Sequence, residues 1–336
     1  MDSETFGELP DGRKVQRVTI RGGGLTARVI TWGAVLQDLR IEGHAPPLVL
    51  GFADFAPYPA HSPHFGAIAG RYANRIRHGR FQIAGQTHQA DTNFLGKHLL
   101  HGGADGTGSR LWTLAAATAD TVTLTYRARD GEMGFPGNLD ITCTYAVRPE
   151  GRLVVELSAE TDAPTLCNLA HHSYFNLDDG GRTHVLDHRL AIAAAAYLPV
   201  DDELMPTGHV VPVEGTDFDF RTPRPIRSGA PYRPYDHNFC LAAARCALTR
   251  AATAHGAHSP LAMEVWTTEP GLQFYDGAGT RQAVPGLDGI AYGAHAGFCL
   301  EPQVWPDAPN RPYFPQATLL PGDRYAQITE YRFRLG

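Results

Sequence analysis

The 336-residue sequence predicts an all-β protein, a large antiparallel β-sandwich, on three observations. Short apolar runs that alternate with polar residues recur along the whole chain, as in half-buried strands. The 36 glycines and 25 prolines exceed the usual share for this length, and many of them separate those runs. No segment shows a long apolar pattern with the 3.6-residue period of a helix. Many strands without intervening helices favour a sandwich over a fold of alternating strands and helices.

The expected strands are bounded by Gly, Pro, Asn or Asp. They are Lys14–Arg21, Leu25–Ile30, Val35–Ile41, Arg80–Ala84, Val122–Arg127, Asp140–Val147, Leu153–Ala159, Leu190–Ala193, Met263–Thr268, Gly271–Tyr275, Phe298–Glu301 and Tyr325–Leu335. The segment from Val147 to Leu153 predicts a hairpin between two long strands. Only the Ala-rich stretches Leu114–Ala119 and Leu241–Ala254 are candidates for helices. Because no linker, repeat or low-complexity block is present, residues 1–336 are expected to form a single domain.

Composition and charge exclude several classes of protein. The net charge of −6 and the lack of a polybasic stretch give the chain no electrostatic reason to bind nucleic acid. Its five cysteines form no CxxC pair, which favours buried thiols in a reducing compartment. The N-terminal residues lack a signal-peptide pattern, and no run of 18 apolar residues predicts a membrane span. We therefore expect a cytoplasmic protein without membrane contact.

Two familiar motifs lack the neighbouring sequence that their usual function requires. The glycine-rich segment Gly103–Gly108 neither opens a helix nor ends in Gly-Lys-Ser/Thr, so it does not predict a nucleotide site. Three pairs of closely spaced histidines lack the helical HExxH context of a metal site. These pairs are His61 and His64, His98 and His101, and His255 and His258. The sequence therefore predicts no metal and no cofactor.

Polar residues gather in several otherwise apolar segments. These segments are Gly70–Ile76, Leu99–Gly103, Asn168–Leu177, Tyr235–Phe239, Gly271–Tyr275 and Phe298–Asn310. Alternation in the third predicts a strand with His172, Tyr174 and Asn176 on one face and His171 on the other. Glu301 closes an apolar run, where a carboxylate is costly to desolvate unless it is paired or functional. Carboxylates, histidines, an arginine and amides together suit a neutral polyhydroxylated ligand that needs proton transfer.

The same segments, in this order, resemble the aldose 1-epimerase (galactose mutarotase) family. The matching stretches are GRYANRI, LLHGG, EMGFPGNLDITCTY, NLAHHSYFNL, YDHNFCL, EPGLQFYDG, CLEPQVWPDAPN and FPQATLLPGDRY. They run from Gly70 to Tyr325, so the resemblance covers most of the chain. It departs from the family's usual pattern at His171 and in the loop Asp276–Ala278, which bears on substrate preference.

The resemblance implies a galactose mutarotase-like β-sandwich and interconversion of the α and β anomers of free hexoses such as galactose and glucose. It assigns Glu301 as the general base for the C1 hydroxyl and His172 as the general acid for the ring oxygen. His101 matches the second histidine of the family's catalytic site. Sugar-binding positions of the family are matched by Asn74, Arg75, Tyr174, Asp236 and Gln273. The implied partner is a small monosaccharide, bound by a monomer or a homodimer.

Other functions stay open at this point. A glycoside hydrolase would use Glu301 and Asp236 as a pair of carboxylates. A sugar-binding module would keep the pocket without turnover, although binding alone needs no matched acid and base. A sugar-phosphate epimerase would need additional basic residues at the mouth of the cleft, for which Arg110 and Arg311 are candidates.

Overall fold

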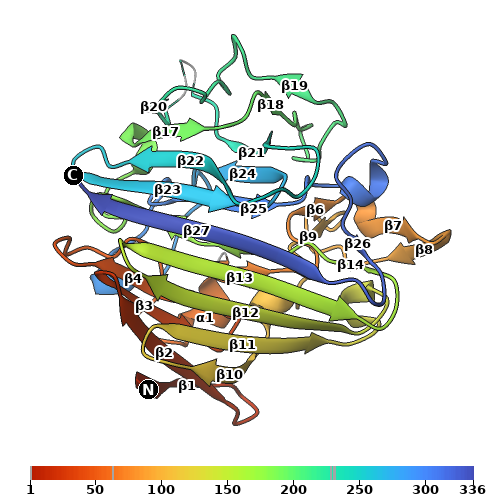
Figure 1. The fold of residues 1–336 in the computed structure, drawn as a ribbon, viewed down its shortest axis with the longest axis horizontal. Helices are drawn as coiled ribbons and strands as arrows, with labels where there is room; N and C mark the ends of the chain where they lie inside the picture. Colours follow the sequence, from red (N-terminus) through yellow and green to blue (C-terminus); the bar gives the residue numbers. More distant parts are fainter. Residues whose placement is uncertain (1, 63, 228, 230–231) are drawn as a thin grey trace.

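A twisted sheet of nine antiparallel strands forms one layer of the protein (Figure 1). The computed structural model describes residues 2–62, 64–227, 229 and 232–336. In spatial order the strands are β10 (Thr113–Ala117), β11 (Thr121–Ala128), β12 (Leu139–Arg148), β13 (Arg152–Thr161), β27 (Tyr325–Leu335), β23 (Leu261–Thr267), β22 (Thr249–His255), β17 (Arg189–Ile192) and β20 (Arg224–Pro225). The C-terminal strand β27 therefore lies at the centre, between β13 and β23.

A second sheet of six antiparallel strands packs against the first. Its order is β16 (Tyr174–Phe175), β25 (Phe298–Gln303), β24 (Gly271–Tyr275), β21 (Asp236–Cys240), β18 (Ala196–Tyr197) and β19 (Val211–Pro212). The ring of Phe175 in this sheet lies 5.0 Å from that of Tyr331 in β27, measured between centroids. Such contacts join the two sheets through one apolar layer.

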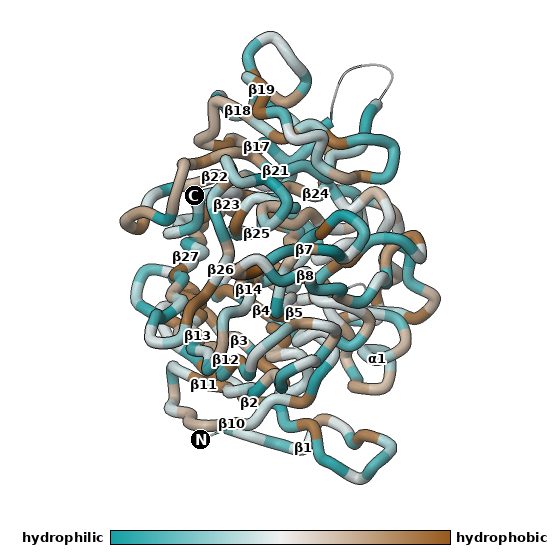
Figure 2. The backbone as a smooth tube through the Cα atoms, turned by 90° about the vertical axis from the view of Figure 1, so that its right-hand side faces the viewer, coloured by the Kyte–Doolittle hydropathy of each residue, from teal (hydrophilic) through white to brown (hydrophobic). Residues whose placement is uncertain are grey.

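Shorter elements complete the fold. An N-terminal sheet contains β1 (Asp2–Glu8), β2 (Lys14–Gly22), β3 (Leu25–Ile30) and β4 (Leu36–Ile41). Two-stranded ribbons pair β5 (Ala67–Ala69) with β15 (Ala170–His172), β6 (Arg75–Ile76) with β9 (Leu99–Leu100), β7 (Arg80–Ile83) with β8 (Gln86–Gln89), and β14 (Thr165–Leu166) with β26 (Thr318–Leu319). In the side view, β12, β13 and β27 lie along one side of the molecule and α1 (Pro57–His61) lies along the other (Figure 2).

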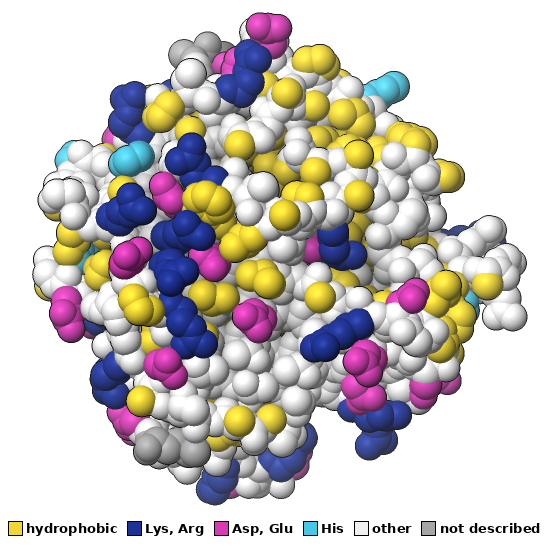
Figure 3. All heavy atoms as spheres, viewed as in Figure 1, with side chains coloured by type: hydrophobic (Ala, Val, Ile, Leu, Met, Phe, Trp, Pro, Cys, Tyr) yellow, Lys and Arg dark blue, Asp and Glu magenta, His cyan; other side chains and the backbone are white. Residues whose placement is uncertain are grey.

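Alternation along the strands separates a core face from a polar face, as period-2 side chains require. In β25, Phe298 and Leu300 belong to the main apolar core, and Phe274 of β24 joins them there. Removing a buried phenylalanine of this kind costs about 3–5 kcal/mol in stability. The outer face of the nine-stranded sheet carries interspersed acidic and basic side chains (Figure 3). Arg332 and Glu330 of β27 form an ion pair there at 2.7 Å. The core covers one face of the six-stranded sheet, so its other face is available for polar side chains.

The predicted sandwich is confirmed, and each of the expected strands overlaps an observed one. The hairpin at Val147 to Leu153 is also confirmed, since β12 and β13 pair there from Arg148 and Arg152 outward. Both helix candidates are wrong, because β10 lies in the first and β22 covers the end of the second. Ala252 and Ala254 are buried between β17 and β23, so cross-strand packing outweighs the helix propensity of alanine.

The largest apolar cluster contains residues from Val18 to Phe333. This continuity supports the expectation of one domain over residues 1–336, which stays a prediction. Among the described residues, α1 is the only α-helix, and no helix is long and apolar enough to cross a membrane.

Candidate active site

A cavity of about 620 Å³ lies over the polar face of the six-stranded sheet. Its polar wall combines residues from sheet strands, ribbons and loops: His64, Asn74, Arg75, His101, His172, Tyr174, Asp236, His237, Tyr275 and Glu301. The size is typical of a small-molecule site. The rest of the wall consists of Leu100, Leu204, Pro234, Ala278 and Gly279. The cavity therefore gathers most of the polar segments that the sequence singled out.

Strand register places the central side chains of the wall. Glu301 of β25 pairs with Gln273 of β24, and Gln273 pairs with Asn238 of β21. Paired residues of antiparallel strands point to the same face, so these three side chains lie on the cavity side. Their neighbours Leu300 and Phe274 point into the core. A one-residue slip of β25 would exchange the polar, cavity-facing side of the strand for the apolar one.

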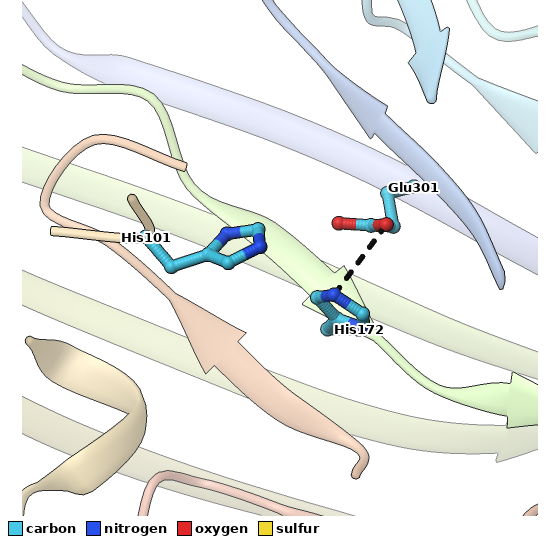
Figure 4. A group of neighbouring side chains, drawn as sticks. All are labelled: His101, His172 and Glu301. Carbon is cyan, nitrogen blue, oxygen red and sulfur yellow. Dashed lines mark ion pairs between the residues drawn. The ribbon is translucent and has the colours of Figure 1, made fainter. Parts of the chain in front are cut away.

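The carboxylate of Glu301 faces the ring of His172 (Figure 4). Oε1 of Glu301 lies 3.5 Å from Nε2 of His172, and the two residues are only 2% and 4% exposed. The second carboxylate oxygen, Oε2, has no hydrogen-bond partner among the described residues. A buried polar atom without a partner is uncommon and needs water or a ligand to satisfy it. The pair therefore leaves an acceptor free for a molecule in the cavity.

Burial controls the protonation of this pair. Desolvation, with a smaller contribution from the charge of Asp236, raises the pKa of Glu301 well above its usual value, although Arg75 opposes the change. Desolvation likewise lowers the pKa of His172 to about 3. Burial therefore favours the uncharged forms of both groups, the protonated carboxyl of Glu301 and the neutral imidazole of His172. Moving the carboxyl proton to the imidazole gives a carboxylate and an imidazolium with the same total charge.

The thiol of Cys299 contacts the other nitrogen of His172. Its Sγ lies 3.6 Å from Nδ1 of His172. Burial raises the pKa of the Cys299 thiol well above its usual value, so the sulfur keeps its proton and can donate it weakly to Nδ1. The two ring nitrogens of His172 thus have different neighbours, the thiol at Nδ1 and the Glu301 carboxyl at Nε2.

His101 enters from a tight turn after β9. Gly102 has a φ of +84°, and a Cβ there would lie 1.8 Å from the carbonyl oxygen of Gly70, so only glycine fits. The backbone N–H of Asn74 donates to Nδ1 of His101 at 3.1 Å. Burial lowers the pKa of His101 well below its usual value, so the ring is neutral and carries its proton on Nε2. His101 is thereby prepared to donate a hydrogen bond.

Arg75, Asp236 and Gln273 form a hydrogen-bonded group beside Glu301. Nη2 of Arg75 donates to Oδ2 of Asp236 at 2.9 Å, and Nε2 of Gln273 donates to Oδ1 at 2.6 Å. Burial alone would raise the pKa of Asp236, but the charge of Arg75 and these hydrogen bonds hold it below its usual value. Asp236 is therefore an anion that accepts hydrogen bonds, unlike Glu301.

His101, His172 and Glu301 each offer one atom to a group whose members lie within 4.8 Å of one another. Two histidines and a carboxylate are a common set of metal ligands. A metal on Nε2 of His101 would force the ring proton onto Nδ1, where the N–H of Asn74 already points. The donor set therefore does not fit a metal ion.

The structure brings seven of the eight expected site residues to the cavity. The eighth, Gln273, is buried and reaches the site through Asp236. Asn176, expected on the face of His172, instead donates from Nδ2 to the carbonyl of Ala296 at 2.9 Å. The strand breaks at Ser173, between β15 and β16, so the predicted alternation does not continue to Asn176. His171 points away from the cavity, as expected, and its Nδ1 lies 3.1 Å from the hydroxyl of Tyr331.

Sequence reasoning missed several residues of the wall. In the sequence, His64 stands out only through its spacing from His61, which does not predict a site, and Leu204 comes from a loop without a recognisable motif. The position of His237 directly after Asp236 in a polar segment does indicate a place near the site. Arg110 and Arg311, the candidates for a phosphate site, line other depressions of the surface and not this cavity.

The comparison with known protein families decides the relationship. The profile of the family described as aldose 1-epimerase matches residues 16–332. The chain belongs to the aldose 1-epimerase family. It is 41% identical to the galactose mutarotase of Mus musculus, over 98% of this chain and 97% of that protein. It is 36% identical to the aldose 1-epimerase of Escherichia coli K12, over 99% of both chains.

Solved structures show the same fold. A GalM/aldose epimerase homologue from C. elegans superposes with a TM-score of 0.87 at 30% identity, over 95% of this chain and 98% of that one. A galactose 1-epimerase from Lactobacillus acidophilus gives 0.84 at 25% identity, over 100% and 98%. The expected galactose mutarotase-like fold is thus confirmed. Membership of the aldose 1-epimerase family makes the chain an isomerase that acts on sugar anomers.

Proposed function

We propose that this aldose 1-epimerase interconverts the α and β anomers of free hexoses, with D-galactose and D-glucose as substrates. The observation that carries the proposal is the buried contact between Glu301 and His172 on the wall of a sugar-sized cavity, at 3.5 Å. Ring opening of a hexose needs one proton removed and one delivered, with no change of oxidation state. A paired carboxylate and imidazole can do both, and each group contributes typically about 10²–10⁴-fold in rate.

In the proposed reaction, the carboxylate of Glu301 removes the proton of the C1 hydroxyl. The imidazolium of His172 delivers a proton to the ring oxygen as the bond between C1 and O5 breaks. Rotation about the C1–C2 bond presents the other face of the aldehyde. Ring closure then runs the two proton transfers in reverse and yields the opposite anomer. Both transfers stay within the pair, so the site exchanges no proton with solvent in a turnover.

The pKa shifts of Glu301 and His172 favour one stage of this cycle, the state that follows ring opening. A protonated Glu301 and a neutral His172, favoured in the free site, are the forms that ring opening produces. The ring form of the sugar requires the opposite arrangement, a carboxylate and an imidazolium. Hydroxyl groups that donate to the free Oε2 of Glu301 would favour the carboxylate when substrate binds. Binding and proton transfer are therefore coupled.

The other residues hold the sugar in this proposal. His101 donates from Nε2 near the ring oxygen, and the anionic Asp236 accepts hydroxyl hydrogen bonds while Arg75 and Asn74 donate them. Tyr174 stacks on His172, with centroids 5.2 Å apart and ring planes at 20°, and so supports the acid from behind. No cofactor takes part in the proposed reaction.

A glycoside hydrolase that uses Glu301 and Asp236 is the second candidate. Both oxygens of Asp236 are engaged, by Arg75 and by Gln273, and this favours a binding role over a second catalytic carboxylate. Release of nitrophenol from nitrophenyl galactosides distinguishes the two functions. We expect none above background, and a rate comparable with that of mutarotation would favour the hydrolase.

Polarimetry of freshly dissolved α-D-galactose and α-D-glucose tests the proposal. The enzyme should speed the approach to the same final rotation that each sugar reaches alone. No acceleration with either sugar would contradict it. Action in the cytoplasm, as a monomer or homodimer that binds a monosaccharide and no nucleic acid, remains part of the proposal.

A further inference from the structure

A third histidine, His64, lines the same cavity as His101 and His172. Its ring centroid lies 4.7 Å from that of His101 and 5.6 Å from that of His172. The rings of His64 and His172 are inclined by only 29°, and Tyr174 stacks on His172 as well. A molecule that contacts His172 in the cavity therefore lies within reach of His64.

Backbone hydrogen bonds hold the turn that carries His64. Oγ of Ser62 accepts from the N–H of Phe65 at 2.9 Å, and the N–H of Gly66 donates to the carbonyl of His172 at 3.0 Å. His64 itself has a φ of +68°, a sparsely populated conformation for a residue with a side chain. Strain of this kind persists where the surroundings impose it, and it is frequent at functional sites. The strand of His172 thus fixes the place of His64.

The ring of His64 has no hydrogen-bond partner within the described part of the chain. Two other histidines of the cavity do have partners. Nδ1 of His101 accepts from the N–H of Asn74, and Nδ1 of His237 accepts from the N–H of Asp236 at 3.1 Å. Burial lowers the pKa of His64 to about 4, so at neutral pH one ring nitrogen donates and the other accepts. A hydroxyl group, which also donates and accepts, is the matching ligand.

His64 lies beside the two histidines that the proposed function places at the ring oxygen. Its ring is adjacent to the rings of both His101 and His172. In a pyranose, the ring oxygen is bonded to C1, which bears the reacting hydroxyl, and to C5, which in a hexose bears the hydroxymethyl group.

We propose that His64 is a further substrate-binding residue, which hydrogen-bonds the C6 hydroxyl of a hexose and so favours hexoses over pentoses. The inference rests on the proposed function, because it takes Glu301 at the C1 hydroxyl and His172 at the ring oxygen. Because His64 lies beside the histidines at the ring oxygen and Glu301 takes the hydroxyl on C1, the substituent on C5 is the group left for His64. A pentopyranose lacks that substituent and leaves His64 without a ligand.

The test compares D-galactose with L-arabinose, which has the same ring configuration but no hydroxymethyl group. His64→Phe keeps a flat ring of similar size and removes both nitrogens. We expect kcat/KM for D-galactose to fall about threefold to tenfold, mainly through KM, as for the loss of one neutral hydrogen bond. L-Arabinose should be turned over as by the wild type. The matched control is His61→Phe, on an exposed residue outside the cavity. It should change kcat/KM for neither sugar.

His64→Asn provides a second variant that keeps a donor and an acceptor, and it should retain more of the preference for D-galactose than His64→Phe. Thermal unfolding shows whether both variants fold. Equal losses on the two sugars, or an unchanged KM for D-galactose, would overturn the role of His64. A wild-type enzyme that accelerates neither sugar would instead contradict the proposed function itself.

Discussion

The backbone N–H of Asn74 donates to Nδ1 of His101 at 3.1 Å, and both residues have a positive φ. Four of the thirteen described non-glycine residues with positive φ line the cavity of the candidate site: His64, Asn74, His101 and Leu204. Local strain therefore concentrates where the sugar is proposed to bind. Its consequence at His101 is a fixed tautomer, with the ring proton on Nε2.

The tautomer of His101 is directly measurable. In protein labelled with ¹⁵N-histidine, long-range ¹H–¹⁵N correlation spectra should show His101 with Nε2 protonated and Nδ1 unprotonated at pH 7. The lowered pKa of His101 predicts that this form persists when the pH is brought to 5.5. An Nδ1-protonated ring, or an imidazolium at pH 5.5, would contradict the assignment. It would also reopen the site to metal binding.

Adjacent histidines provide a matched test of the proposed acid. His172→Gln removes the group that protonates the ring oxygen, so kcat for mutarotation of D-galactose should fall about 10²–10⁴-fold. His171→Gln is the control, because His171 faces the core and contacts Tyr331 and Ser173. That variant should keep most of the wild-type rate. Similar losses in both variants would mean that the effect is structural.

Arg75 and Asp236 should affect binding more than chemistry. Arg75→Ala and Asp236→Ala each remove a charged hydrogen-bonding partner of the sugar, and KM should rise about tenfold to hundredfold. Saturation kinetics of both variants separate KM from kcat. Arg80→Ala, on an exposed residue of β7, should leave KM unchanged. A loss confined to kcat would count against the binding role.

The sequence predicts the strands well because their signal is local. Strands such as Leu25–Ile30, Gly271–Tyr275 and Tyr325–Leu335 have the predicted bounds, since turn residues end the apolar alternation on both sides. The pairing of β27 between β13 and β23 joins segments far apart in the chain, and no local pattern specifies it. The same reason explains β22, whose alanines form a strand because two neighbours flank it.

Some residues of the candidate site follow from local motifs, whereas others are placed only by the fold. The family resemblance assigned Glu301, His172 and Asp236 from their motifs, and the structure brings all three to one cavity. It could not place His64, whose side chain reaches the cavity through a strained turn tied to β15. The sequence offers both Asp236 and Glu301 as ion-pair partners of Arg75, and the structure shows the pair with Asp236, 161 positions away in the chain. Protonation depends on burial, and burial is a property of the assembled sheet.

Buried neutral histidines should make the fold sensitive to acid. Burial lowers the pKa of His171 to about 3, whereas in the unfolded chain a histidine titrates near its usual value of about 6.5. Below that value the unfolded state binds more protons, so the free energy of unfolding falls as the pH falls from 6.5 toward 3. Each such histidine contributes up to about 1.4 kcal/mol per pH unit to this slope.

Denaturant unfolding of His171→Gln between pH 6 and pH 4 tests this linkage. The variant should lose stability with falling pH less steeply than the wild type, by about 1.4 kcal/mol per pH unit near pH 5. His209→Gln, on an exposed residue, should keep the wild-type slope. An unchanged slope in His171→Gln would show that this histidine is protonated in the folded state.

Glu301 carries the central claim, and polarimetry of α-D-galactose with Glu301→Gln tests it most directly. The amide keeps the shape of the side chain but cannot accept the proton of the C1 hydroxyl. We predict a loss of at least about 10²-fold in kcat, with sugar binding by calorimetry largely retained, and wild-type behaviour in the exposed control Glu42→Gln. A Glu301→Gln enzyme that mutarotates galactose at close to the wild-type rate would contradict the account.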